Sequence, residues 1–192
     1  MSERQVSVDG RTYPMAVPFV VFATQNPIEH EGTYRLPEAQ LDRFLFKIDV
    51  LYPDLEQELN ILKEHHSQKE NNKEDLVNPV VTVEEIVQFQ SLVKQIYVHE
   101  DILKYITEII IQTRTNPYLS LGASPRASIA ILEASKASAA LQGRDFVTPE
   151  DVKYVAESIL AHRIQLTPEK EMEGFTAAYI IQQIIDSVEI PR

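Results

Sequence analysis

The chain has 192 residues, of which 44% are hydrophobic and 24% are charged, and its formal net charge at pH 7 is −11. This composition is typical of a globular protein and excludes a disordered or fibrous chain. The negative charge argues against binding to the phosphate backbone of nucleic acids, because such binding depends on clustered Lys and Arg side chains. There is no cysteine, which excludes disulfides and zinc–thiolate sites and is compatible with a reducing compartment.

The sequence contains no apolar stretch long enough to span a membrane, and its first ten residues lack the hydrophobic centre of a signal peptide. We therefore predict a cytoplasmic protein without a membrane span.

Strand patterns dominate the first 53 residues. Val6 and Val8 alternate with polar residues ahead of Asp9-Gly10, which predicts a β-hairpin. The apolar run 19–24 is typical of a strand buried on both faces of a parallel sheet, and the alternation in 46–50 indicates a half-exposed edge strand. A hairpin and two strands cannot cover the buried strand, so we expect the rest of the sheet to lie in sequence missing from this chain.

Helix signals take over after Pro53. Asp54 with Gln57 and Thr82 with Glu85 have the spacing of capping boxes. The polar run 64–75 predicts a solvated loop. Further helices are predicted over 101–113, 125–141, 149–162 and 175–188. The fold class is therefore an α/β fragment in residues 1–53 followed by an all-α domain in residues 54–192.

Asn26 directly follows the apolar strand and precedes Pro27, which keeps it extended. The carboxyl ends of parallel strands border the ligand crevice of an open sheet. An amide there can orient a water molecule or a phosphate oxygen. An ordinary Asn-Pro turn is the alternative, and on the isolated residue the pattern favours it.

Arg43 raises the question of what it contacts. On a helix that begins near Pro37, Leu41, Phe44 and Leu45 share one side and Arg43 lies nearly opposite them. No acidic residue stands three or four positions before it, so no intrahelical ion pair accounts for it. It points either into solvent, which the helical wheel alone favours, or at a partner.

The segment GASPRAS, residues 122–128, places Arg126 in the first turn of a helix capped by Ser124 and begun by Pro125. The helix dipole disfavours a cation there. Free backbone amides and a guanidinium group at a helix start together suit a phosphate group. The other reading, which the sequence supports equally, is an exposed arginine that tolerates the small cost.

Other chemistry finds little support. His65 and His66 diverge on a helix and His30 has no spaced partner, so metal ligation is disfavoured at both places. The sequence has neither a GxSxG nucleophile motif nor the GxxxxGK[ST] pattern of a P-loop.

Three segments together resemble the AAA+ ATPases of the MoxR family. They are ERQVSVDG, FVVFATQNPIEHEGTYRLPEAQLDRFLFKI and GASPRAS. The resemblance extends from Glu3 to the C-terminus and is densest through residue 50. It implies that residues 1–53 are the C-terminal part of the AAA+ core, with Walker A and Walker B missing, and that residues 54–192 are the helical lid. We accordingly expect this chain alone not to hydrolyse ATP.

The resemblance also implies roles for the three polar residues. Asn26 corresponds to sensor 1, which positions the hydrolytic water. Arg43 corresponds to the arginine finger that reaches ATP in the neighbouring subunit, and Arg126 corresponds to sensor 2 of the lid, acting in cis or in trans. The implied cofactors are ATP and Mg²⁺, whose ligands lie largely outside this chain, so we expect no metal site here. The implied assembly is a ring, expected to be a hexamer, with a von Willebrand factor A domain protein as a possible partner.

The implied function is ATP-driven, chaperone-like remodelling or assembly of client proteins. Two other readings stay open. The absence of a P-loop and the dominance of helices fit a non-catalytic interaction module. A helicase loader that binds nucleic acid is a further alternative, which the charge of −11 disfavours.

Overall fold

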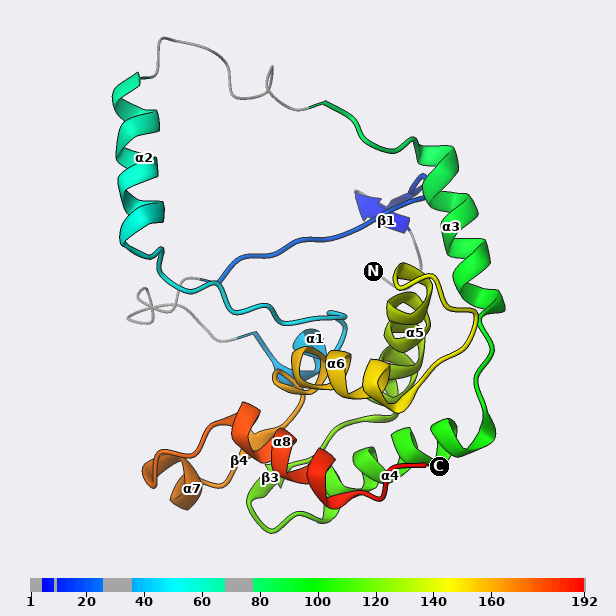
Figure 1. The fold of residues 1–192 in the computed structure, drawn as a ribbon, viewed down its shortest axis with the longest axis vertical. Helices are drawn as coiled ribbons and strands as arrows, with labels where there is room; N and C mark the ends of the chain where they lie inside the picture. The colour runs from blue at the N-terminus through cyan, green and yellow to red at the C-terminus, as the bar shows by residue number, and fades with distance from the viewer. Residues whose placement is uncertain (1–4, 9, 26–35, 68–77, 192) are drawn as a thin grey trace.

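The structure is a computed structural model that describes residues 5–8, 10–25, 36–67 and 78–191 (Figure 1). Its elements in chain order are β1 (Gln5–Val8), β2 (Arg11–Pro14), α1 (Glu38–Leu41), α2 (Leu55–Ser67), α3 (Val83–Gln95), α4 (Glu100–Thr115), β3 (Leu119–Leu121), α5 (Pro125–Leu141), α6 (Pro149–Leu160), β4 (Gln165–Leu166), α7 (Pro168–Met172) and α8 (Ala177–Ser187). No described helix is long and apolar enough to cross a membrane.

The N-terminal part contains the predicted hairpin but not the two predicted sheet strands. β1 and β2 pair antiparallel, with Val8 opposite Arg11. Residues 19–24 and 46–50 run without regular secondary structure, and Phe22 and Val50 are both 90% exposed. A strand exists only through hydrogen bonds to a neighbour, and no described segment pairs with either run. Their apolar side chains consequently remain uncovered in this chain.

Four helices build the core of the C-terminal part. α5 packs against α4 and α6, and α8 packs against α4 and α6. Small side chains on one side of α5 allow this close approach, because Ala127, Ala130 and Ala134 are all buried there. Large aliphatic side chains from the other helices fill the space around them, including Ile109, Ile159 and Ile181.

A short two-stranded sheet interrupts this part, which the sequence predicted to be wholly helical. β3 and β4 pair antiparallel, and the Ser120 hydroxyl donates to the carbonyl of Leu166 at 2.9 Å. Strands of two and three residues carry too little periodicity to be recognised from sequence. The sheet brings the chain that follows α6 beside the chain that leads into α5.

The loop between β3 and α5 is fixed against the end of α4. The Ala123 amide donates to the Thr113 hydroxyl at 3.0 Å, and Arg114 Nε donates to the Ala123 carbonyl at 2.9 Å. Gly122 allows this approach, since a Cβ there would lie 2.7 Å from the Arg114 Cα. These contacts set the position of Ser124, where α5 begins.

Helices α2 and α3 begin as predicted. Asp54 and Gln57 bond each other's amides, as do Thr82 and Glu85. The predicted loop over 64–75 is wrong at its start, because α2 continues to Ser67, and residues 68–75 lie outside the described residues.

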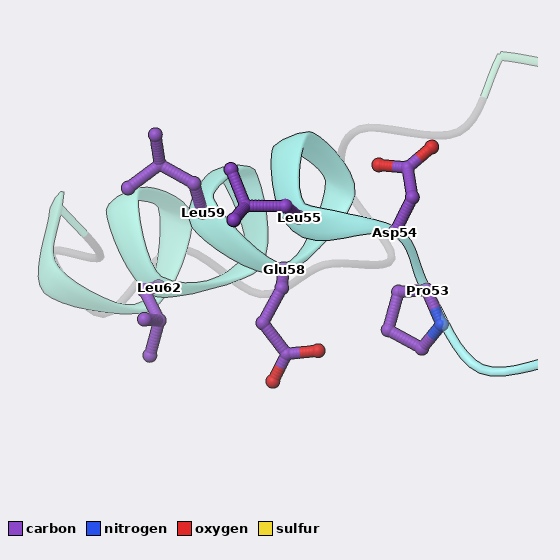
Figure 2. A pocket seen from close by; sticks show the side chains of 6 residues that line it. All are labelled: Pro53, Asp54, Leu55, Glu58, Leu59 and Leu62. Carbon is purple, nitrogen blue, oxygen red and sulfur yellow. The ribbon is translucent and has the colours of Figure 1, made fainter.

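Helix α2 stands apart from the other elements and buries none of its residues (Figure 1). Its apolar side chains line a shallow pocket together with Pro53, Asp54 and Glu58; they are Leu55, Leu59 and Leu62 (Figure 2). The pocket contains the carboxylates of Asp54 and Glu58 and no cationic side chain, so it lacks the groups that bind phosphate.

Candidate functional site

Helix α1 is shorter than the sequence indicated, and Arg43 lies in the turn that follows it. The helix ends at Leu41, and Asp42 is its C-cap. The next amides bond three residues back, from Arg43 to the Gln40 carbonyl at 3.2 Å and from Phe44 to the Leu41 carbonyl at 3.0 Å. This tighter pattern replaces the continued helix assumed by the helical wheel.

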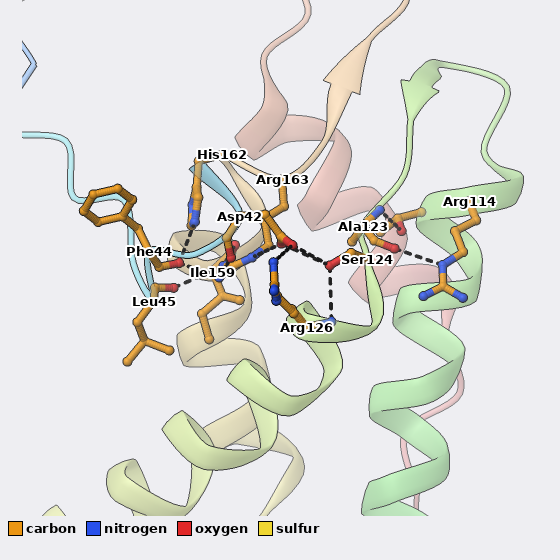
Figure 3. Close-up of polar contacts among 11 residues, drawn as sticks. Asp42, Phe44, Leu45, Arg114, Ala123, Ser124, Arg126, Ile159, His162 and Arg163 are labelled. Atoms are coloured by element: carbon orange, nitrogen blue, oxygen red, sulfur yellow. Dashed lines mark hydrogen bonds and ion pairs between the residues drawn. The ribbon is translucent and has the colours of Figure 1, made fainter. Parts of the chain in front are cut away.

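The Asp42 carboxylate joins α1 to the start of α5 and the end of α6 (Figure 3). Ser124 Oγ donates to it, lying 3.0 Å from both oxygens. Arg163 Nε donates to Oδ1 at 3.0 Å, and an Arg126 terminal nitrogen lies 3.5 Å from Oδ2. We call Asp42, Ser124, Arg126 and Arg163 the Asp42 cluster. The Asp42 side chain is 18% exposed. Its charge is neutralised by Arg126 and Arg163, which belong to the helical part of the chain.

Arg163 uses all of its hydrogen-bond donors within the molecule. Its side chain is 3% exposed. Besides the bond to the Asp42 carboxylate, its guanidinium group donates to four backbone carbonyls, those of Asp42, Phe44, Leu45 and Ile159. A guanidinium group has five N–H donors in a planar fork, so this one side chain is saturated. Burial lowers the pKa of Arg163 from its ordinary value, and Asp42 opposes that shift.

Two further contacts hold the same segment against α6. His162 Nε2 lies 3.0 Å from the Phe44 carbonyl, and the Lys47 amide donates to the Ser158 carbonyl at 2.9 Å. Burial lowers the pKa of His162, which favours the neutral ring. Because a carbonyl oxygen can only accept, Nε2–H is the donor to Phe44. Residues 42–47 are therefore bound to the C-terminal end of α6 at several points.

The Asp42 carboxylate supplies the anion expected at the start of α5. Ser124 caps this helix by accepting from the Arg126 amide at 3.2 Å. Its hydroxyl hydrogen is left for Asp42, which also neutralises the unfavourable cation of the first turn. Arg126 is nonetheless 55% exposed, and at 3.5 Å its ion pair is long and weakened by solvent. This guanidinium group thus keeps donors available for another ligand.

The three residues singled out from the sequence have different environments. Asn26 lies outside the described residues. The Arg43 side chain is exposed and forms neither a hydrogen bond nor an ion pair with any residue that the structure describes. Arg126 contacts Asp42, the residue immediately before Arg43. Within the described ranges, no group of three or more His, Asp or Glu side chains is placed to hold a metal ion.

The sequence reasoning missed Arg163 and the role of Asp42. A signal existed, because Arg163 stands between the apolar pair Ile159–Leu160 and Ile164. An arginine inside an apolar run is either exposed by a turn or buried with partners. Its main partner is 121 positions away in the sequence, which no local pattern can reveal.

Comparison with known proteins places the two halves of the cluster in two family models. The model described as "ATPase family associated with various cellular activities (AAA)" matches residues 1–46, and the model described as "AAA lid domain" matches residues 111–184. The first includes Asn26, Asp42 and Arg43, and the second includes Arg126 and Arg163. The Asp42 cluster consequently joins the two matched regions.

Similar proteins match along the whole chain. An uncharacterised protein of Bacillus subtilis, YeaC, is 44% identical over 191 residues, covering 100% of this chain and 59% of its own length. Chaperone MoxR1 of Mycobacterium tuberculosis is 37% identical over 201 residues, covering 100% of this chain and 52% of its own. A crystal structure of a protein named as an ATPase, from Cytophaga hutchinsonii, superposes with a TM-score of 0.88 at 38% identity, over 100% of this chain and 60% of that one. The chain thus spans between half and two thirds of the length of each.

Proposed function

Because the chain belongs to the MoxR family of AAA+ ATPases, we propose that the whole protein hydrolyses ATP and uses the energy to remodel or assemble client proteins. A chaperone named MoxR1 among its relatives supports this reading. The α/β end of the core and the helical lid that this chain supplies are parts of such an enzyme.

Arg43 is the residue on which the proposal depends most. Its backbone lies between Asp42 and Phe44, whose carbonyls are both held by Arg163, while its own side chain is exposed and unpaired among the described residues. A cation on a fixed backbone without an internal partner suits a ligand on another molecule. We propose that Arg43 is the arginine finger, which neutralises charge developing on ATP held by the adjacent subunit.

Arg126 and Asn26 complete the proposed set. Arg126 retains exposed donors at the start of α5, where backbone amides and the helix dipole also favour an anion; we assign it to the γ-phosphate as sensor 2. Asn26 is assigned to orientation of the attacking water as sensor 1, on the resemblance alone. Mg²⁺, when bound with ATP, neutralises charge on the phosphates, and its ligands are proposed to lie outside this chain.

Several further features belong to the same proposal. The protein would act as a ring, expected to be a hexamer, in the cytoplasm, with a von Willebrand factor A domain protein as a partner. Residues 1–53 would form the end of the α/β core and residues 54–192 the lid. This sequence contains no GxxxxGK[ST] motif, so by itself the chain is expected neither to bind ATP tightly nor to hydrolyse it.

The test uses the full-length protein with Arg43→Ala. We expect kcat for ATP hydrolysis to fall by about 10³-fold or more, because the finger acts on charge that develops in the transition state, with little change in KM. Arg43→Lys should remain strongly impaired, since an ammonium group lacks the planar fork of a guanidinium group. Lys63→Ala, which removes an exposed cation from α2, is the matched control and should retain activity.

Action in trans is tested in mixed rings. Subunits with Arg43→Ala retain their P-loop, and subunits with a substituted P-loop lysine retain Arg43; neither type alone should hydrolyse ATP. Mixing them should restore activity at interfaces where the second type presents Arg43 to ATP on the first. An Arg43→Ala ring with unchanged kcat, or assembled mixed rings without activity, would contradict the assignment.

A further inference from the structure

We infer that Asp42 and Arg163 are positioning residues for Arg43, so that the lid sets where the finger of the same subunit points. This inference rests on the proposed function, because it gives Arg43 the role of a finger. It assigns to the Asp42 cluster a role in addition to joining the two matched regions.

The hydrogen bonds from the end of α6 fall on the backbone around Arg43. Arg163 binds the carbonyls of Asp42, Phe44 and Leu45, which are the peptide groups around Arg43. His162 adds a second donor to the Phe44 carbonyl, at 3.0 Å. Figure 3 shows these contacts on both sides of Arg43, at Asp42, Phe44 and Leu45. The backbone is thus fixed before and after Arg43, whose own side chain is exposed.

Helix α1 alone cannot fix the turn that contains Arg43. The helix has four residues and buries none of them, and short isolated helices are unstable in water. The bonds within the turn reach back only three residues. Rigidity must come from outside, and among the described contacts it comes from the end of α6 and from Ser124 at the start of α5.

Arg126 contacts the same Asp42 carboxylate as Arg163. The buried Arg163 holds Oδ1 at 3.0 Å, and the exposed Arg126 approaches Oδ2 at 3.5 Å. A ligand that drew Arg126 away would leave Asp42 with Ser124 and Arg163, so the turn would stay bound to the lid. Any movement of the lid on binding an anion would therefore be carried to Arg43.

The experiment uses the mixed rings of full-length protein, with Arg163→Lys placed in one subunit type at a time. The lysine retains the charge but loses the fork that bonds several carbonyls at once. In the subunit that donates Arg43, we expect activity to fall about 10²-fold, since misplacement by about 1 Å costs this much. In the subunit that supplies the P-loop, the loss should be at least about tenfold smaller.

Two controls separate positioning from stability. Arg144→Lys alters another lid arginine paired with a carboxylate, Asp151, without contact to residues 42–47; in the donating subunit it should leave activity unchanged. The double variant Arg43→Ala/Arg163→Lys should be no slower than Arg43→Ala, because residues acting as one unit are not additive. Equal losses from Arg163→Lys in both subunit types, or none in the donating type, would overturn the inference.

A measurement on the unmodified protein covers the case in which Arg163→Lys fails to assemble. Hydrogen exchange at the amides of Phe44 and Lys47 should be slow, because both donate within the held segment. Exchange as fast as in an open loop would overturn the inference without any variant. If Arg43 proves dispensable in the mixed rings, the proposed function fails; if Arg43 is required and Arg163→Lys is harmless, only the positioning role fails.

Discussion

Asp151 is a buried carboxylate whose removal should destabilise the helical part of the chain by a predictable amount. The residue is 1% exposed at the start of α6. It accepts from two Arg144 nitrogens at 2.7 Å, from the Thr148 amide at 2.9 Å and from the Ser138 hydroxyl at 2.9 Å. It thereby ties α5 and the loop after it to the first turn of α6.

The magnitude follows from the pKa. Burial opposes ionisation, but the hydrogen bonds from Arg144, Thr148 and Ser138 outweigh it and lower the pKa of Asp151 from 3.8 to about 2. A shift of this size corresponds to about 2 kcal/mol of folding free energy at pH 7. Asp151→Asn leaves Arg144 without its ion-pair partner, but that side chain is 24% exposed and can be rehydrated. We therefore expect a total loss of about 2–3 kcal/mol.

The pH dependence has a definite sign. Between pH 2 and 3.8 the unfolded carboxyl binds more protons than the folded one, so lowering the pH favours unfolding. The stabilisation is complete above the unfolded pKa and is lost as the pH falls through the folded pKa. The difference in unfolding free energy between the native chain and Asp151→Asn should be constant near neutrality and reduced by about half at pH 3.

Urea unfolding followed by circular dichroism, at pH 7 and again near pH 3, measures this difference. Asp145→Asn is the matched control, because it removes an exposed carboxylate from the same loop, and its effect should stay within about 0.5 kcal/mol. A loss at pH 7 no larger than that of the control, or a loss that does not shrink on acidification, would refute the reasoning.

Two further substitutions test the supports of the Asp42 cluster. Gly122→Ala places a Cβ 2.7 Å from backbone atoms of Thr113 and Arg114. Because backbone atoms cannot move aside without strain, the free energy of unfolding should fall by about 1–3 kcal/mol in thermal unfolding. An unchanged melting temperature would show that α4 is not held there. His162→Gln tests the group whose pKa burial lowers below 6.5. The native chain should lose stability in urea as the pH falls from about 7.5 through 6.5 because the unfolded ring binds the proton more readily, whereas the variant should not; equal slopes would contradict this.

Local chemistry accounts for what the sequence could predict. The starts of α3 and α5 were located because Thr82 and Ser124 bond amides only two or three residues away. Arg43 is exposed, as predicted, although the helix on which that prediction relied ends at Leu41.

The remaining features depend on distant parts of the chain. The predicted strands over 19–24 and 46–50 require neighbours that the described residues do not provide. The environment of Asp42 depends on Arg163, across 121 positions of sequence. Only the folded chain reveals that Asp42 is covered by Ser124 and Arg163.

Because Lys47 is fixed against α6, the segment around α2 can vary in its number of residues. The amide of Lys47 donates to the Ser158 carbonyl, and α3 packs against α5, so the segment that contains α2 is attached to the helical part of the chain on both sides. Doubling the length of a loop between two fixed ends costs only about 0.6 kcal/mol of closure entropy. Insertions beside α2 should accordingly be accommodated without displacing either anchor, which makes this the natural place to graft a reporter peptide onto the molecule.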